Sequence, residues 1–143
     1  MVDLPMVLKP SDATPYRVYT PFYRAWCTHG WRAPAKTPTK IPAVTPPAKY
    51  RAFPDFPMPA GVNVIAAGEK AALARFKEFT KKGLDSYDEN RNFSAIDGTS
   101  KMSTYLKFGE IHPRTLLAGL GESKSHDTFR KEIAWREFYA DVL

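Results

Sequence analysis

The sequence predicts a mainly α-helical protein, in which a proline-rich linker precedes the first helices of a helical domain. Twelve of the thirteen prolines fall within the first 59 residues, and proline removes a backbone donor and clashes with the preceding helical turn. From Gly68 onward apolar side chains recur at helical spacing, and no convincing alternation typical of strands is present. The sequence therefore divides into residues 1–67 and residues 68–143.

Composition indicates one soluble domain in a reducing compartment, which we expect to be the cytoplasm. A chain of 143 residues is long enough for a hydrophobic core. Its composition, 43% hydrophobic and 25% charged, is typical of a globular protein. No apolar run could span a membrane, and the N-terminus lacks the features of a signal peptide. The single cysteine, Cys27, is expected to be a buried apolar residue rather than a nucleophile.

The net charge of +6 makes an anionic partner plausible. The excess lies mostly in residues 1–67, which carry eight Lys and Arg against three Asp and Glu. Residues 68–143 carry thirteen against twelve. Charge alone therefore favours nucleic acid only mildly.

The first half contains one predicted helix, Pro21 to His29, with proline in its first turn. The stretch from Ala33 to Pro59 is predicted to be an extended linker. Its apolar residues suggest that it packs against something; they are Tyr50, Phe53, Phe56 and Met58.

Four further helices are predicted in the second half. The first runs from Glu69 to Lys82, with Ala72, Leu73, Phe76 and Phe79 on its apolar face and Gly83 as its stop. A polar loop follows over residues 86–98. Thr99 and Ser100 are candidate caps of a short helix through Leu106, and His112 flanks a helix that starts at Pro113. Ser125 or Asp127 is expected to cap the final helix.

The final helix, Asp127 to Leu143, places Glu132, Trp135, Arg136 and Tyr139 on one face. A carboxylate, an indole, a guanidinium and a phenol together suit a planar, hydrogen-bonding and partly anionic ligand. The alternative is aromatic packing of Trp135 and Tyr139 at a contact between helices.

A second cluster, Thr99, Ser100 and Ser103, places three hydroxyls beside exposed backbone amides at a helix start. Such an arrangement can hold a phosphate without a glycine-rich loop. The alternative is a capped helix with no ligand.

These motifs, in this order, resemble the DNA photolyase/cryptochrome family. The resemblance covers nearly the whole chain: PYRVYTPFYRAW, GEKAALARF, Tyr87–Arg91 (YDENR), TSKMSTYLKFGEIHPR and EIAWREFY. Its detail is closer to the class I cyclobutane pyrimidine dimer photolyases than to signalling cryptochromes. It implies that residues 1–67 are the end of the antenna-domain connection and an interdomain linker. Residues 68–143 would then be the N-terminal part of the FAD-binding helical domain.

The resemblance also implies roles for individual residues. The FAD-binding positions would be Tyr87, Thr99, Ser100, Lys101, Met102, Ser103 and Phe129. The DNA-binding positions would be Arg91, Glu132, Trp135, Arg136 and Tyr139. Among these, Glu132 and Trp135 match the catalytic pair that receives the flipped dimer. No metal is implied.

The implied activity is light-driven repair of pyrimidine dimers in DNA by electron transfer from reduced FAD. Two alternatives are a cryptochrome-type photoreceptor and a helical DNA-binding module without flavin. Family members are far longer than 143 residues, so we expect a fragment of a protein that is monomeric at full length. The isolated chain should be poorly soluble and bind FAD weakly or not at all, because apolar surface would be left exposed.

Overall fold

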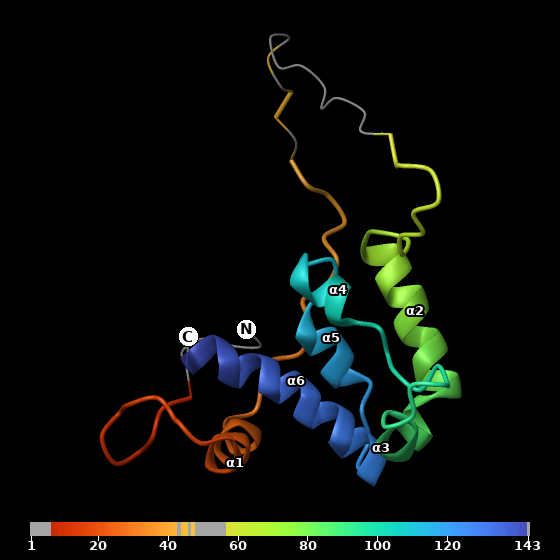
Figure 1. Cartoon of the computed structure of the whole chain (residues 1–143). Helices are drawn as coiled ribbons and strands as arrows, with labels where there is room; N and C mark the ends of the chain where they lie inside the picture. Colours follow the sequence, from red (N-terminus) through yellow and green to blue (C-terminus); the bar gives the residue numbers. More distant parts are fainter. Residues whose placement is uncertain (1–6, 43, 46, 48–56, 143) are drawn as a thin grey trace. The chain divides into compact units, whose positions relative to one another are not determined.

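The computed structural model of the chain describes residues 7–42, 44, 45, 47 and 57–142 (Figure 1). Within these residues the secondary structure is helical, and the only β pairing is an isolated bridge between Leu8 and Pro15. The predicted mainly α class is confirmed. Tyr50, Phe53 and Phe56, which we expected to pack, lie outside the described residues.

The chain forms two compact units. One comprises the described residues of Met1–Pro34 and Ala67–Leu143, and the other those of Ala35–Ala66. The described part of the second unit contains no helix or strand. The segment before residue 35 thus groups with the helical part of the chain, although the sequence division had placed it with the linker.

Helix α1, Tyr19–His29, begins two residues before the predicted start, with Pro21 in its first turn. Gly30 ends it at a φ of 68°, where its N–H donates to the carbonyl of Trp26. That left-handed backbone favours glycine, because a Cβ would crowd the neighbouring carbonyl. Phe22 and Trp26 are buried, whereas Cys27 is exposed, so its predicted burial was wrong.

Helix α2, Glu69–Lys82, has the predicted bounds and is followed by Gly83. Ala72, Phe76 and Phe79 are buried, but Leu73 is 41% exposed. The predicted apolar face was therefore too wide. The i, i+4, i+7 positions face the core, and Leu73 lies about 100° further around the helix.

The predicted loop over residues 86–98 begins as ordered structure. A 3-10 turn, Leu84–Ser86, leads directly into the short helix α3, Tyr87–Asn90. Burial of Leu84 and Tyr87 fixes this segment, and the Ser125 hydroxyl bonds both the N–H and the carboxylate of Asp88. Tertiary contacts thus override a polar local sequence.

Helix α4, Ser103–Lys107, starts later than predicted, and neither Thr99 nor Ser100 caps it. The cause is Lys101, whose φ of 57° interrupts any helix that would begin at residue 99. Helix α5, Pro113–Ala118, begins as expected. His112 precedes it, and its Nδ1 accepts a bond from the N–H of Arg114 at 3.2 Å.

Helix α6, Lys124–Val142, begins before both predicted caps. The hydroxyl of Ser123 accepts from the N–H of His126 at 3.3 Å, which is the role we had assigned to Ser125 or Asp127. Ser125 instead turns inward to Asp88.

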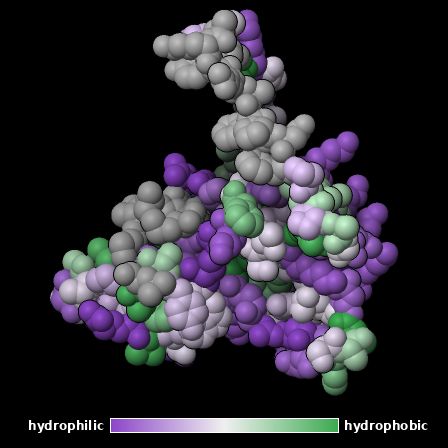
Figure 2. Space-filling model, turned by 45° about the horizontal axis from the view of Figure 1, so that its top comes forward, coloured by the Kyte–Doolittle hydropathy of each residue, from purple (hydrophilic) through white to green (hydrophobic). Residues whose placement is uncertain are grey.

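In the helical unit, α6 lies against α1 on one side and against α3 on the other (Figure 1). Buried side chains from these helices and α2, α4 and α5 form one continuous core. The face shown in Figure 2 is largely hydrophilic over the described residues, with apolar colour confined to small patches. No helix in the described part is both long and apolar enough to cross a bilayer.

Candidate functional site

A cavity of about 440 Å³ lies between α3, the segment that leads into α4, and α6. This volume lies within the usual range of small-molecule sites. Its lining residues are Tyr87, Thr99, Ser100, Lys101, Met102, Ser103, Leu106, Lys107, Phe129, Glu132, Ile133 and Arg136. All seven predicted FAD-binding positions, and two of the five predicted DNA-binding positions, are among them.

The apolar part of the cavity is aromatic. Tyr87 and Phe129 are buried and meet edge to face, with ring centroids 5.3 Å apart and planes at 88°. Phe79 of α2 packs on both rings from behind. Burial raises the pKa of the Tyr87 phenol, and the nearby Glu132 carboxylate raises it further. Tyr87 therefore stays a neutral, rigid wall.

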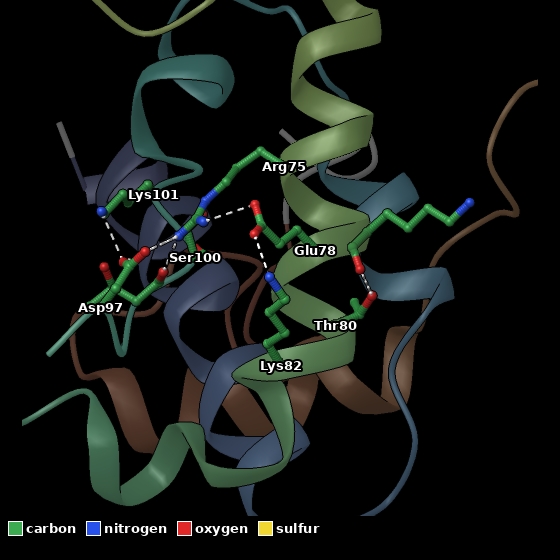
Figure 3. A network of polar contacts seen from close by, with 9 residues as sticks. Arg75, Glu78, Thr80, Lys82, Asp97, Ser100 and Lys101 are labelled. Atoms are coloured by element: carbon green, nitrogen blue, oxygen red, sulfur yellow. Dashed lines mark hydrogen bonds and ion pairs between the residues drawn. The ribbon is translucent and has the colours of Figure 1, made fainter.

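The polar part is the segment from Thr99 to Ser103. The hydroxyl of Ser100 accepts from the N–H of Met102 at 3.3 Å, and Lys101 takes the left-handed backbone noted above. Gly98 allows this segment to approach α3, since a Cβ there would come 2.4 Å from the carbonyl oxygen of Asn90. The ammonium of Lys101 bonds to Asp97 at 2.9 Å (Figure 3).

Glu132 and Arg91 form an ion pair at the edge of the cavity, with Nη1 and Oε1 2.5 Å apart. The Arg91 guanidinium also lies over the Tyr87 ring, 5.5 Å from its centroid. The hydrogen bond to Glu132 raises the pKa of Arg91. Arg91 itself does not line this cavity. It lines a second hollow, together with residues 92–97, Thr99 and Lys101. Two of the five residues predicted to bind DNA therefore form an ion pair with each other.

Trp135 and Tyr139 do not line the cavity. The indole of Trp135 stacks on the ring of Tyr19 of α1, with centroids 3.5 Å apart and planes 6° apart. The ring of Tyr139 also stacks on the indole, with centroids 5.5 Å apart. Trp135 and Arg136 are consecutive, so their side chains leave the helix about 100° apart. Arg136 reaches the cavity while Trp135 reaches α1. The four side chains predicted to share one face of α6 therefore point to two places. Glu132 and Arg136 line the cavity, whereas Trp135 packs against α1.

The sequence missed several residues of this region. Leu106, Lys107 and Ile133 line the cavity, although no motif had linked them to a ligand. Tyr19 was not singled out, yet its hydroxyl donates to the carbonyl of Lys131 at 2.9 Å. No motif could have found it, because the contact joins residues 112 positions apart.

The fold and cavity define a helical domain with a pocket suited to an aromatic, anionic ligand. No group of three or more His, Cys, Asp or Glu side chains able to hold a metal occurs among the residues that the structure describes.

Comparison with known proteins identifies the relatives of such a domain. The chain is 39% identical to a deoxyribodipyrimidine photo-lyase of Alkalihalophilus pseudofirmus, over 95% of this chain and 30% of that protein. It is 36% identical to the corresponding photo-lyase of Agrobacterium fabrum, over 97% of this chain and 32% of the relative. No family model matches the chain.

Among solved structures, a bacterial class III photolyase from Agrobacterium tumefaciens matches with a TM-score of 0.73 and 32% identity. The match covers 95% of this chain and 31% of that one. The similarity to the DNA photolyase/cryptochrome family is therefore confirmed in sequence and in fold. The chain spans about a third of the length of these relatives. The assignment to class I stays a prediction, since this structural relative belongs to class III.

Proposed function

We propose that this chain contributes part of a flavin and DNA site, and that a polypeptide of photolyase length containing it repairs cyclobutane pyrimidine dimers with light. The observation that carries the proposal is the cavity itself. Its lining joins Tyr87, residues 99–103, Phe129 and Glu132, which lie far apart in sequence and which the motifs had linked to FAD and DNA. The photo-lyase names of the relatives support the same activity.

The residues fit FAD by chemistry. Buried rings of Tyr87 and Phe129 suit a planar ring system, and the hydroxyls of Thr99, Ser100 and Ser103 suit a polyol and phosphate oxygens. Lys107 and Arg136 add positive charge at the same cavity. When bound, reduced flavin supplies light-driven electron transfer. The residues of this chain bind it, orient it and exclude water from its rings.

For DNA, we propose that Glu132 reads the edge of a flipped pyrimidine and that Arg91 contacts a phosphate. Their ion pair keeps the Glu132 carboxylate directed along the cavity edge before DNA arrives. Trp135 is half-buried, and one of its faces is covered by Tyr19. It could serve as a stacking platform only through its remaining surface. An aromatic platform contributes about 1–3 kcal/mol per base.

A cryptochrome-type photoreceptor is the less favoured alternative, because the relatives are named for repair. A receptor would bind flavin without preferring damaged DNA. A helical DNA-binding module would bind DNA without flavin, with a steep dependence on salt.

The first experiment is a titration of the chain with FAD, followed by the change in flavin fluorescence. We expect weak but saturable binding. Ser103→Ala should weaken it about threefold, since one hydrogen bond contributes about 0.5–1.5 kcal/mol. Thr104→Ala is the matched control: it removes the neighbouring exposed hydroxyl, which does not line the cavity. Equal effects of both variants, or absence of saturable binding in a polypeptide of photolyase length that contains this chain, would contradict the flavin assignment.

The second experiment separates repair from signalling. With FAD present, the chain should bind an oligonucleotide containing a thymine dimer more tightly than the undamaged strand. Equal affinity for both strands, with flavin bound, would favour the photoreceptor alternative.

A further inference from the structure

Arg75 lies on α2 and does not line the cavity. Its guanidinium nevertheless contacts the segment from Thr99 to Ser103, the polar wall of the cavity (Figure 3). Nε donates to the carbonyl of Ser100 at 3.2 Å, and Nη2 donates to the carbonyl of Thr99 at 3.0 Å. Nη2 also lies 3.3 Å from both carboxylate oxygens of Asp97. One side chain therefore holds Thr99 and Ser100 of this segment together with Asp97, which precedes it.

These contacts fix the direction of two peptide groups. In a planar trans peptide the C=O and the following N–H point in opposite directions. Because the carbonyls of Thr99 and Ser100 point to Arg75, the N–H groups of Ser100 and Lys101 point away from it. The guanidinium thereby orients backbone donors of the polar wall from behind.

The left-handed backbone of Lys101 makes such support necessary. A non-glycine residue at a φ of 57° costs roughly 1–2 kcal/mol, and persists where surrounding contacts over-determine it. The carbonyl just before it is the one that Nε of Arg75 holds. Asp97 completes this arrangement, since its Oδ1 binds both Nη2 of Arg75, at 3.3 Å, and the ammonium of Lys101, at 2.9 Å.

Arginine suits this position better than lysine would. Its planar guanidinium presents several donors in fixed directions, and the Arg75 side chain is only 21% exposed. Lysine has the charge but cannot donate to two carbonyls and a carboxylate in one plane.

We propose that Arg75, oriented by Asp97, is a positioning residue for phosphate recognition at the cavity. It holds Thr99–Lys101 in the one conformation that presents their amides and hydroxyls to the pyrophosphate of FAD. The proposal rests on the flavin site proposed above. It adds that affinity for the phosphate part of the ligand depends on a residue that does not touch the ligand.

FAD and riboflavin separate this role from a general structural one. Riboflavin has the ring system and polyol but no phosphate. Loss of a merely structural contact would lower the affinity for both ligands by the same factor. Loss of the contacts that Arg75 and Asp97 make with the polar wall should lower the affinity for FAD selectively.

The experiment compares Arg75→Gln, Arg75→Lys and a control, Glu78→Gln, in the complete 143-residue chain. Glu78 lies on the same helix, reaches Arg75 only at 3.5 Å and forms its shorter ion pair with Lys82, at 3.0 Å. Affinities for FAD and riboflavin are measured by flavin fluorescence. Hydrogen exchange of peptides covering residues 97–103 and α6 is measured without ligand.

Arg75→Gln should weaken FAD binding about tenfold, since hydrogen bonds from a charged group that hold Thr99 and Ser100 are lost. Riboflavin binding should weaken clearly less, because riboflavin can lose only the polyol contacts of this segment and has no phosphate. Exchange should rise in residues 97–103 and stay unchanged in α6. Arg75→Lys should retain part of the FAD affinity, and Glu78→Gln all of it.

Two results would overturn this role of Arg75 while leaving the flavin site intact. One is wild-type FAD affinity in Arg75→Gln. The other is an equal loss of FAD and riboflavin. A polypeptide of photolyase length that contains the wild-type chain and binds neither flavin would instead overturn the proposed function, and the role of Arg75 in binding with it.

Discussion

Two sides of α6 differ in what their side chains meet. On one side Phe129, Glu132 and Arg136 line the cavity, where polar groups reach the surface beside an aromatic wall. On the other side Trp135 and Phe138 meet the rings of Tyr19 and Phe22 of α1. The cavity side leaves space for a ligand, whereas the α1 side is filled by aromatic contacts.

The difference shows that residue type alone does not separate a binding face from a packing face. Glu132 and Trp135 are three positions apart and were predicted to act as a pair. In the structure each contacts a different neighbour: Arg91 pairs with the carboxylate, and Tyr19 stacks on the indole. Changes on the α1 side should therefore affect stability more than ligand binding, and changes on the cavity side should do the reverse.

The largest effect is expected for Phe22→Ala on α1. Phe22 is buried and its ring lies 5.3 Å from that of Phe138. Removing a buried phenylalanine side chain costs about 3–5 kcal/mol, so the midpoint of urea unfolding should fall steeply. Leu73→Ala is the control, because Leu73 is exposed on α2 and should change little. A change of similar size in both variants would mean that α1 does not belong to the cooperative core.

Next in size is the coupling between Tyr19 and Trp135. A double-mutant cycle with Tyr19→Leu and Trp135→Leu should give about 0.5–1.5 kcal/mol, as expected for a stacked aromatic pair. The free energy of unfolding of the four proteins measures it. A coupling energy of zero would mean that the Tyr19–Trp135 contact does not stabilise the fold. The α1 side of α6 would then not differ from the cavity side, and Trp135 would be available to stack on a damaged base.

The sequence could predict the helices whose signals are local. Pro21, Pro113 and Gly83 mark the ends or first turns of α1, α5 and α2 near where the structure has them. The ordered start of the 86–98 segment could not be predicted, because Tyr87 is held by burial against α2 and α6 rather than by its neighbours in sequence.

For the candidate site, the motif resemblance predicted most of the cavity lining but not its limits. Trp135 was predicted to share a face with Glu132, but its indole stacks on Tyr19 of α1 and does not line the cavity. Arg75 carries no signal of its own, since an arginine on a polar helix surface is ordinary. Its contacts to Thr99 and Ser100 exist only after α2 and that segment have packed.

A smaller effect with a pH signature is expected for Tyr23→Phe. The Tyr23 hydroxyl donates to Asp127 at 2.6 Å, joining α1 to α6. Burial raises the pKa of Asp127, but bonds from Lys131, Tyr23 and Arg130 outweigh it and lower that pKa overall. The variant should lose about 1 kcal/mol or less at pH 7, because Asp127 is partly exposed.

The lowered pKa of Asp127 gives the direction of the pH dependence. Its ionised form is favoured by folding, so this stability is present above the unfolded value of about 3.9 and is lost as pH falls through the lower folded pKa. The difference between wild type and Tyr23→Phe should therefore shrink below about pH 4. Unfolding curves across this range measure it, and a difference that does not change with pH would contradict the hydrogen bond.

The smallest effect on stability is expected on the cavity side, for Glu132→Gln. The ion pair with Arg91 is partly exposed, at 31% and 37% for the two side chains, so its loss should cost less than about 1 kcal/mol and less still in high salt. The same variant should reduce the preference for a dimer-containing oligonucleotide, because an amide cannot hold Arg91 or read the pyrimidine edge as the carboxyl group does. Glu89→Gln is the control, since Glu89 is an exposed carboxylate of α3 that does not line the cavity. If Glu132→Gln destabilised the fold as much as Phe22→Ala while DNA preference stayed intact, Glu132 would be a structural residue and the two sides of α6 would not differ in function.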